Sequence, residues 1–373
     1  MSVLRQIPFF NYQKAFSSSE EDCVRIFRDV LRRGAFILQK DLSDFESHLA
    51  QYLGVKHAIG LANGTDALII ALRSAGIGKG DEVIFPSHTM VASPASIFFS
   101  GATPVPVECG RDHLIDPDSI HKAITPRTRA IMPAQLNGRT AAMDKIQEIA
   151  DQHGLLIIED AAQALGSKYK GKFAGTFGVA GAFSFYPAKT LGCLGDGGAL
   201  VTNDDAIASS ASLYRDHGRN SDGEVVMWGL NARLDNLQAA ILDLQFKDYS
   251  KNIERRRKTA KLYHEALGDI AEISLPPFPD SDRDHFDIYQ NYEIEAERRD
   301  ALRVFLKENG IGTLMPWGGK AVHQFESLGF KARLPFTERL FQRCLLLPMN
   351  TQVLEEDVEY IADKIHEFYK RKS

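Results

Sequence analysis

The sequence predicts an α/β protein: a mostly parallel sheet flanked by helices, followed by a smaller α+β unit at the carboxyl end. Three observations predict this fold class. Strand-sized apolar runs alternate with helical patterns between residues 44 and 205, these runs are continuously apolar, and a proline-rich break at 276–279 precedes a different pattern. Continuous apolar strands that alternate with helices are typical of parallel sheets covered on both faces.

The elements of the first unit follow in order. Residues 58–62 read as a strand, Asn63-Gly64 breaks it, and a helical pattern continues to about Gly76. Four further strand-like runs lie at 81–86, 103–108, 129–134 and 155–160. A helix is expected over 143–154, between the last two runs. Because ligands of such sheets collect beyond the carboxyl ends of the strands, we expect the functional site there.

The carboxyl-terminal part has a different pattern. Helical periodicity runs from about Leu234 to Leu267, and its cluster of Arg and Lys is typical of a solvated helix face. After the break come a strand candidate at 286–296, a helix at 298–310 and a terminal helix at 353–372. This order of elements predicts a small α+β unit.

Length and composition favour a soluble protein of two domains. The chain has 373 residues, 44% of them hydrophobic, and its 49 acidic against 44 basic side chains give a formal net charge of −5. One hydrophobic core stops growing beyond about 250–300 residues. We therefore expect a large cofactor-binding domain over residues 1–250 and a small C-terminal domain over residues 251–373. The mild acidity argues against nucleic-acid binding, since it would repel phosphate groups.

Cysteine spacing and hydropathy indicate the compartment. The four cysteines lie far apart, with no CxxC pair or zinc spacing, which predicts reduced thiols and no metal site. The N-terminal stretch has no apolar run of signal-peptide length, and apolar runs elsewhere are strand-sized. We expect a cytoplasmic protein without membrane contact.

Asp160 and Lys189 carry the chemistry that the sequence predicts. Asp160 ends an apolar strand, where a carboxylate is costly unless it meets a cation, although a helix N-cap is an alternative interpretation. Lys189 follows the aromatic run 183–186 and precedes glycines, surroundings that suit a buried amine able to form a Schiff base, unless the lysine is simply solvated. Together they fit a pyridoxal 5′-phosphate site, in which the carboxylate keeps the pyridine nitrogen protonated.

The phosphate of such a cofactor needs its own binding site. Residues 63–66 open a helix after a strand, and free N–H groups at a helix N-terminus bind anions. Gly64 allows close backbone approach, and Thr65 and Ser184 add hydroxyl groups, although helix capping explains the first segment equally well. Gln163 would face the cofactor ring if the chain after Asp160 is helical.

Other reactions find less support in the sequence. The glycine-rich run at 192–198 does not match the dinucleotide fingerprint G-x-G-x-x-G, and a strand rather than a helix is expected after it. No P-loop, HExxH or G-x-S-x-G pattern occurs in the chain. A dehydrogenase and these hydrolase classes are therefore disfavoured.

At these motifs the chain resembles the sugar aminotransferases of the DegT/DnrJ/EryC1/StrS family, which have the type I aminotransferase fold. The motifs that carry the resemblance are NGTDAL at 63–68, GDEVIFPSHTMVAS at 80–93, GATPVPVE at 101–108, EDAAQALGSKYKGKFAGTFG at 159–178, FSFYPAKTLGCLGDGGALVTND at 183–204, RDHGRN at 215–220 and GLNARLDNLQAAILDLQ at 229–245. ENGIGT and LLLPMN near the carboxyl end also correspond, so the resemblance spans almost the whole chain.

The resemblance implies a homodimer with active sites at the subunit interface. It implies that Lys189 and Asp160 are catalytic and also bind the cofactor, and that Gln163 contacts the cofactor ring. The remaining implied cofactor contacts are Gly64, Thr65 and Ser184 at the phosphate, together with Asn231 from the neighbouring subunit. Asn231 could equally cap the helix that follows it.

Three departures from the family pattern concern the cofactor ring and the substrate. Met90 stands where many relatives carry an aromatic residue that stacks on the ring. QLNG at 135–138 replaces HLYG, and MPWGGKAVHQF at 315–325 replaces the HYP…H segment. The implied substrate-binding residues of this second segment are Trp317, Lys320 and His323.

The expected reaction is transfer of an amino group from L-glutamate to a keto group of a nucleotide-linked deoxysugar, for amino-sugar, lipopolysaccharide or antibiotic biosynthesis. The first specific expectation is dTDP-4-keto-6-deoxyglucose, with a 3-keto sugar or a UDP- or GDP-linked sugar as alternatives. A dehydratase of the same fold is disfavoured, because such relatives carry histidine in place of Lys189. A regulatory protein that binds a sugar nucleotide is the non-enzymatic alternative, which Lys189, Asp160 and Gln163 disfavour.

Overall fold

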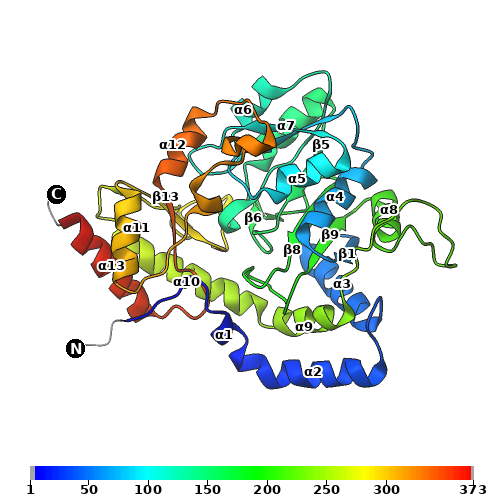
Figure 1. Ribbon diagram of the computed structural model, residues 1–373, viewed down its shortest axis with the longest axis horizontal. Coiled ribbons are helices and arrows are strands. Elements are labelled where there is room, and N and C mark those ends of the chain that lie inside the picture. The colour runs from blue at the N-terminus through cyan, green and yellow to red at the C-terminus, as the bar shows by residue number, and fades with distance from the viewer. Residues whose placement is uncertain (1–4, 371–373) are drawn as a thin grey trace.

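The computed structural model describes residues 5–370, and its largest element is a seven-stranded sheet (Figure 1). In spatial order the strands are β1 (His57–Leu61), β9 (Gly198–Thr202), β8 (Ala180–Ser184), β5 (Leu156–Asp160), β4 (Thr128–Ile131), β2 (Glu82–Pro86) and β3 (Thr103–Val107). The pairs from β8 to β3 are parallel, whereas β9 runs antiparallel to both of its neighbours. The predicted mostly parallel sheet is confirmed.

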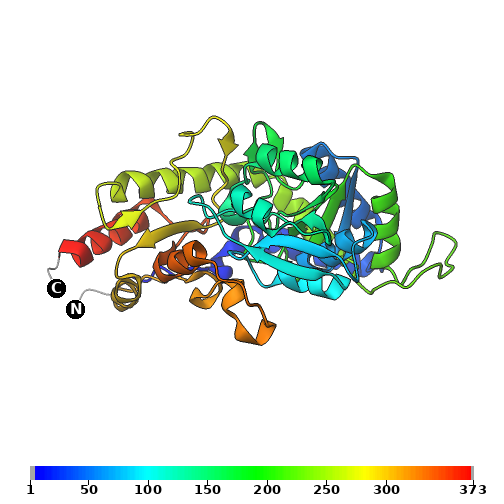
Figure 2. The same ribbon diagram turned by 90° about the horizontal axis from the view of Figure 1, so that it is seen from above.

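Helices cover both faces of this sheet (Figures 1 and 2). They are α3 (Lys40–Leu53), α4 (Gly64–Ser74), α5 (Ala92–Ser100), α6 (Pro117–Ala123), α7 (Met143–His153), α8 (Asp205–Arg215) and α9 (Asn236–Phe246). One face packs against α4, α5 and α8, and the other against α3, α9, α6 and α7. Val83 and Phe85 enter the first core and Ile84 the second, which explains why the strand is apolar throughout.

A second, three-stranded sheet lies in the carboxyl-terminal part. Its strands are β10 (Ile273–Ser274), β12 (Tyr292–Ala296) and β13 (Cys344–Leu347), all antiparallel. The helices α10 (Tyr249–Leu267), α11 (Arg299–Glu308) and α13 (Glu355–Lys370) share its core. Within α10, Tyr249 packs in the core beside the large sheet and Leu267 in the core of the small one. The domain boundary at residue 250 stays a prediction.

The remaining elements are short or lie at the periphery. They are α1 (Tyr12–Ala15), α2 (Glu20–Arg33), α12 (Pro335–Arg343), the strands β6 (Lys168–Tyr169), β7 (Lys172–Phe173) and β11 (His285–Phe286), and the 3₁₀ turns at Ser17–Ser19, Leu136–Gly138, Pro316–Gly319, Val322–Gln324 and Glu326–Leu328. Between residues 5 and 370, every helix is too short or too polar to cross a membrane.

Two expected elements are each divided in the structure. The strand expected over 286–296 becomes β11, which pairs with β6, and β12, which pairs with β13. Tyr289, with φ 52°, turns the chain between them, and Gln290 then reaches the loop around Lys189. The helix expected over 234–267 divides at residues 247–248, because α9 packs against α3 whereas α10 continues to α13.

Candidate active site

A cavity of about 300 Å³ lies beyond the carboxyl ends of β5 and β8. Its wall brings together eight of the eleven residues singled out from the sequence: Gly64, Thr65, Met90, Asp160, Gln163, Ser184, Lys189 and Trp317. Its position matches the rule that ligands of open α/β sheets bind beyond the strand ends. Its volume is at the lower end of the range for small-molecule sites.

The loop that carries Lys189 is held from two sides. Gln290 donates from Nε2 to the carbonyl oxygen of Ala188 (2.8 Å) and accepts from the N–H of Thr190 (2.8 Å). The hydroxyl of Thr190 lies 2.8 Å from that of Tyr249. Burial lowers the pKa of the Lys189 amine to about 8, against an opposing effect of the Asp160 charge. A lysine of lowered pKa is more often neutral and can act as a nucleophile or a base.

Asp160 is fixed by two hydrogen bonds at the end of β5. Its Oδ2 accepts from the hydroxyl of Ser93 (2.6 Å), and its Oδ1 accepts from the N–H of Ala162 (3.2 Å). The helix-cap interpretation is wrong, because residues 161–166 form turns rather than a helix. Asp160 therefore has no helix to cap, and its carboxylate lines the cavity instead.

Glu159, the neighbour of Asp160, points to the other side of the strand and is fully buried. Its two oxygens accept hydrogen bonds from Gln135 Nε2 (2.8 Å) and from the N–H groups of Gly175 (2.8 Å), Phe177 (2.6 Å) and Gly178 (3.1 Å). Side chains alternate across a strand, so one carboxylate faces the cavity and the other anchors a loop.

Gln163 lines the cavity for a different reason than expected. The helix that was to orient it is absent from this part of the described chain, because residues 161–166 turn back on themselves. Instead, Gln163 Oε1 accepts from the N–H of Asn137 (2.9 Å) and from Asn291 Nδ2 (3.2 Å). Its amide thereby joins the segment 135–138 to the turn before β12.

The first turn of α4 forms the opposite end of the cavity. Asn63 is the N-cap, and its Oδ1 accepts from the N–H of Asp66 (2.8 Å). The N–H groups of Gly64 and Thr65 belong to the first turn, where the helix itself offers no acceptor. A Cβ on Gly64 would lie 2.9 Å from the Cβ of Ser184, so this close approach requires glycine. Asn63 therefore caps the helix, and the N–H groups of Gly64 and Thr65 remain available for an anion.

These residues fit pyridoxal 5′-phosphate. The cavity offers an amine of lowered pKa at Lys189, a carboxylate at Asp160, and a helix N-terminus with the hydroxyls of Thr65 and Ser184. The three groups match the aldehyde, the pyridine nitrogen and the phosphate of this cofactor.

Met90 and Trp317 contribute the apolar part of the wall. Met90 is 48% exposed and lines the cavity. Trp317 adopts φ 51°, and its indole N–H is buried without a hydrogen-bond partner within residues 5–370. A buried N–H without an acceptor is costly, so a ligand that accepts its hydrogen bond would be favoured.

Three predicted residues do not line this cavity. Asn231 is exposed and lies five positions before α9, whose N-cap residue is Asp235, so it does not cap that helix. Lys320 is exposed. His323 is buried, with Nδ1 2.7 Å from the hydroxyl of Ser87 and Nε2 3.2 Å from Glu338 Oε1. The roles assigned to these three residues stay predictions.

Comparison with known proteins decides the family. The family model for the DegT/DnrJ/EryC1/StrS aminotransferase family matches residues 17–366. The chain belongs to this family. It is therefore a transaminase, and the cofactor of its family, pyridoxal 5′-phosphate, is the one that the cavity fits.

Individual relatives extend over the whole chain. A pleiotropic regulatory protein of Geobacillus stearothermophilus is 40% identical over 98% of this chain and 99% of its own length. A dTDP-3-amino-3,4,6-trideoxy-α-D-glucose transaminase of Streptomyces venezuelae is 39% identical over 98% and 97%. The crystal structure of S. venezuelae DesV in complex with a ketimine intermediate superposes with a TM-score of 0.94 at 38% identity, covering 99% of this chain and 100% of that one.

Two residues at the site were missed by the sequence reasoning. Ser93 orients Asp160, and Gln290 fixes the loop around Lys189. Ser93 lies in the motif at 80–93, so its place in the motif was a usable signal. The contact of Gln290 with this loop could not be predicted, because its segment reads as a continuous strand.

Proposed function

We propose that this protein transfers an amino group from L-glutamate to a keto group of a nucleotide-linked deoxysugar. The observation that carries the proposal is one cavity that joins Lys189, Asp160 and the N-terminus of α4, in a chain of the aminotransferase family. The S. venezuelae relative takes its name from a dTDP-linked amino sugar.

When bound, the cofactor supplies an electron sink for the carbanion charge that develops during amino transfer. Lys189 Nζ takes the proton from Cα of the amino donor and later returns a proton to the carbon that becomes aminated, a task that requires a neutral amine. Asp160 keeps a proton on the ring nitrogen and is itself oriented by Ser93. Gly64, Thr65 and Ser184 would bind the phosphate, and Met90 and Gln163 would contact the ring.

The sequence and the names of the relatives favour different sugar substrates. The first specific candidate is dTDP-4-keto-6-deoxyglucose, aminated at C4. The name of the S. venezuelae transaminase instead places the amino group of its sugar at C3, which favours a 3-keto sugar as the second candidate. Trp317 would bind the sugar nucleotide, since its indole N–H is a buried donor without an acceptor. His323 and Lys320 are proposed to assist from the same segment.

The direct test supplies ¹⁵N-labelled L-glutamate and the dTDP-, UDP- and GDP-linked 3-keto and 4-keto sugars, and follows the label by mass spectrometry and NMR. Transfer of the label to the sugar supports the proposal, and the labelled carbon decides between the candidates. Transfer of the label from L-glutamate to the cofactor, with no labelled sugar from any of these substrates, would reject the sugar class while keeping the transaminase. Trp317→Phe should raise KM for the sugar about tenfold, the effect of one lost hydrogen bond.

We further propose a homodimer in which Asn231 of one subunit completes the phosphate site of the other. Asn231 is exposed, and exposed apolar side chains lie nearby at Val225, Val226 and Trp228. A mixture of Lys189→Ala and Asn231→Ala subunits, refolded together, should then regain activity, because each mixed dimer contains one intact site. A mixture of Lys189→Ala and Asp160→Ala is the control and should stay inactive. Equal behaviour of the two mixtures would contradict the shared site.

A regulatory protein that binds a sugar nucleotide is the second candidate function, and the name of the Geobacillus relative favours it. Such a protein needs no Schiff-base lysine. Cofactor retention without any amino transfer from L-glutamate or another amino acid would support it.

A further inference from the structure

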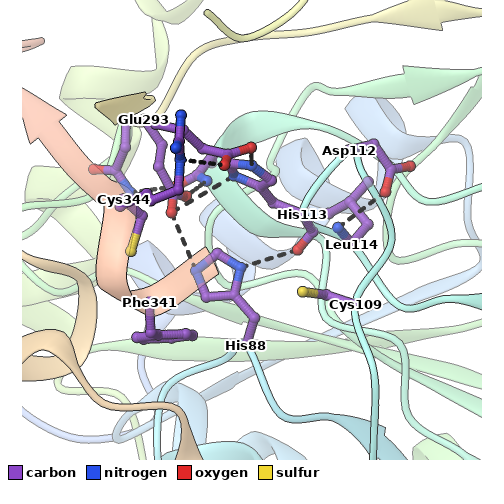
Figure 3. Close-up of polar contacts among 12 residues, drawn as sticks. His88, Cys109, Asp112, His113, Leu114, Glu293, Phe341 and Cys344 are labelled. Carbon is purple, nitrogen blue, oxygen red and sulfur yellow. Dashed lines mark hydrogen bonds and ion pairs between the residues drawn. The ribbon is translucent and has the colours of Figure 1, made fainter. Parts of the chain in front are cut away.

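Two histidines and a glutamate from distant parts of the chain meet in one cluster (Figure 3). Two of them, His88 and Glu293, line a pocket that also contains Lys189. His88 follows β2, His113 lies between β3 and α6, and Glu293 belongs to β12 of the small sheet. His88 is 1% exposed and Glu293 3% exposed, and their facing atoms, with that of His113, lie within 4.8 Å of one another. The proposed amino transfer uses none of the three.

Neighbouring acceptors decide which ring nitrogen of each histidine faces the cluster. His88 Nδ1 lies 3.0 Å from the carbonyl oxygen of His113, which can only accept, so Nδ1 carries the hydrogen. His113 Nε2 lies 3.4 Å from Glu295 Oε1, and by the same argument this nitrogen carries the hydrogen. His88 Nε2 and His113 Nδ1 remain as the nitrogens that face Glu293.

The carboxylate of Glu293 likewise has one atom held by a neighbour and one atom that faces the cluster. Its Oε2 accepts a hydrogen bond from Asn137 Nδ2. Its Oε1 lies 3.3 Å from His88 Nε2 and 3.6 Å from His113 Nδ1, and this buried atom has no hydrogen-bond partner within the described chain. Three atoms that can each offer a lone pair therefore face one point, an arrangement that a metal ion or a proton between them would stabilise.

We propose that His88 Nε2, His113 Nδ1 and Glu293 Oε1 bind one divalent transition-metal ion, Zn²⁺. At metal–ligand distances of about 2.0–2.2 Å, neighbouring tetrahedral ligands lie about 3.4 Å apart, close to the two observed spacings of 3.3 and 3.6 Å. Two imidazoles and one carboxylate form a known zinc ligand set that leaves a fourth position open.

Groups behind each ligand also suit a metal site. The carbonyl oxygen of His113, the carboxylate of Glu295 and the amide of Asn137 each hold the far side of one ligand. Such outer contacts orient metal ligands and set their tautomers. Phe341 packs edge-on against His88, with ring centroids 5.0 Å apart, and excludes water from that side (Figure 3).

A proton is the competing occupant of the cluster. Burial lowers the pKa of the His113 ring, but the charge of Glu293 outweighs this effect and raises that pKa to about 10. A protonated His113 would also neutralise the carboxylate. Because a metal must displace that proton, a test has to detect the metal itself.

The site joins the two sheets of the molecule. His88 and His113 belong to loops of the large sheet, whereas Glu293 belongs to the small one. A bound ion would therefore hold the two sheets together and stabilise the folded chain by mass action. The sequence prediction of no metal site came from cysteine spacing, which carries no signal from positions 88, 113 and 293.

The test uses holoenzyme freed of unbound cofactor and treated with a chelator. Titration with Zn²⁺ by calorimetry should show one saturable site per chain, and Co²⁺ should give the strong visible absorption of a four-coordinate ion. Zn²⁺ should also raise Tm. Wild-type protein that binds neither ion saturably would overturn the proposal, and this outcome needs no variant that might fail to fold.

Variants assign the site to the cluster. Glu293→Gln should weaken Zn²⁺ binding at least a hundredfold, and Glu295→Gln, which removes only an outer contact, about tenfold. His48→Gln is the control and should bind normally, since its ring pairs with Asp243 elsewhere. Unchanged binding by a folded Glu293→Gln variant would place the metal at another site and overturn the proposal. Metal binding is measured without turnover, so this result is independent of the proposed amino transfer.

Discussion

The cavity around Lys189 has two walls that the chain builds in different ways. The wall toward the cofactor uses strand ends and a helix start: Asp160 ends β5, Ser184 ends β8, and Gly64 begins α4. The opposite wall uses turns, at Trp317 and around Asn137. The strands and helix of the large sheet position the residues of the first wall, whereas irregular backbone positions those of the second.

The two walls also differ in backbone strain. Asn137 (φ 56°) and Trp317 (φ 51°), which line a pocket together with Lys189, adopt left-handed conformations, and so does Tyr289 (φ 52°), the residue before Gln290. Asparagine tolerates this region, but bulky residues rarely do. Each such residue costs about 1–3 kcal/mol and persists only where its surroundings hold it. We infer that the second wall is the one adapted to a particular substrate.

The largest effect should come from the first wall. Lys189→Ala should lower the rate of amino transfer about a thousandfold or more, because the general base is lost. The fold should persist, since the side chain ends in a cavity. The measurement is single-turnover transfer from L-glutamate, with circular dichroism as the control for folding. Substantial remaining turnover would remove Lys189 from the reaction.

Asp160 and Glu159 are adjacent in the chain, but only Asp160 lines the cavity, so their replacement should have different effects. Asp160→Asn should lower kcat roughly a hundredfold or more, the scale for loss of one electrostatic contact to the reacting system. Glu159→Gln should leave kcat of the folded protein nearly unchanged but lower the free energy of unfolding by about 1–3 kcal/mol, because it disturbs four hydrogen bonds. Kinetics and denaturant titration measure both variants. Equal losses of kcat would mean that the wrong carboxylate has been assigned.

Gln290 connects the two walls, and its removal should have an intermediate effect. Gln290→Ala releases the backbone of residues 188 and 190, so Lys189 is less well positioned. Misplacement by about 1 Å can cost a hundredfold in rate. The loss should fall on kcat for the L-glutamate half-reaction, with little change in cofactor affinity. An effect on KM for the sugar alone would assign Gln290 to the substrate wall.

The smallest expected effect is a shift to lower pH in the pH dependence of proton transfer by Lys189. With the pKa of Lys189 lowered to about 8, the neutral amine is scarce below that pH and predominant above it. The rate of proton transfer in the L-glutamate half-reaction should therefore rise about tenfold per pH unit below pH 8 and level off above it. Stopped-flow measurement checks this. A rate that still rises at pH 10 would indicate an ordinary solvated lysine.

The same contrast explains what the sequence could predict. The cofactor wall lies within local motifs, so Gly64, Asp160, Ser184 and Lys189 could be found from strand ends and neighbouring residue types. Gln290 could not, because a left-handed turn at Tyr289 interrupts a segment whose composition reads as one strand. Gln163 was found for the wrong reason, since turns replace the helix expected after Asp160.

The most direct test of the account is the visible absorption spectrum of protein reconstituted with pyridoxal 5′-phosphate, before and after addition of L-glutamate. We expect a yellow band that requires Lys189 and that bleaches when L-glutamate is added. A protein that stays colourless after full reconstitution, or one whose Lys189→Ala variant shows the same band and the same bleaching, would contradict the assignment of Lys189 and the amino transfer built on it.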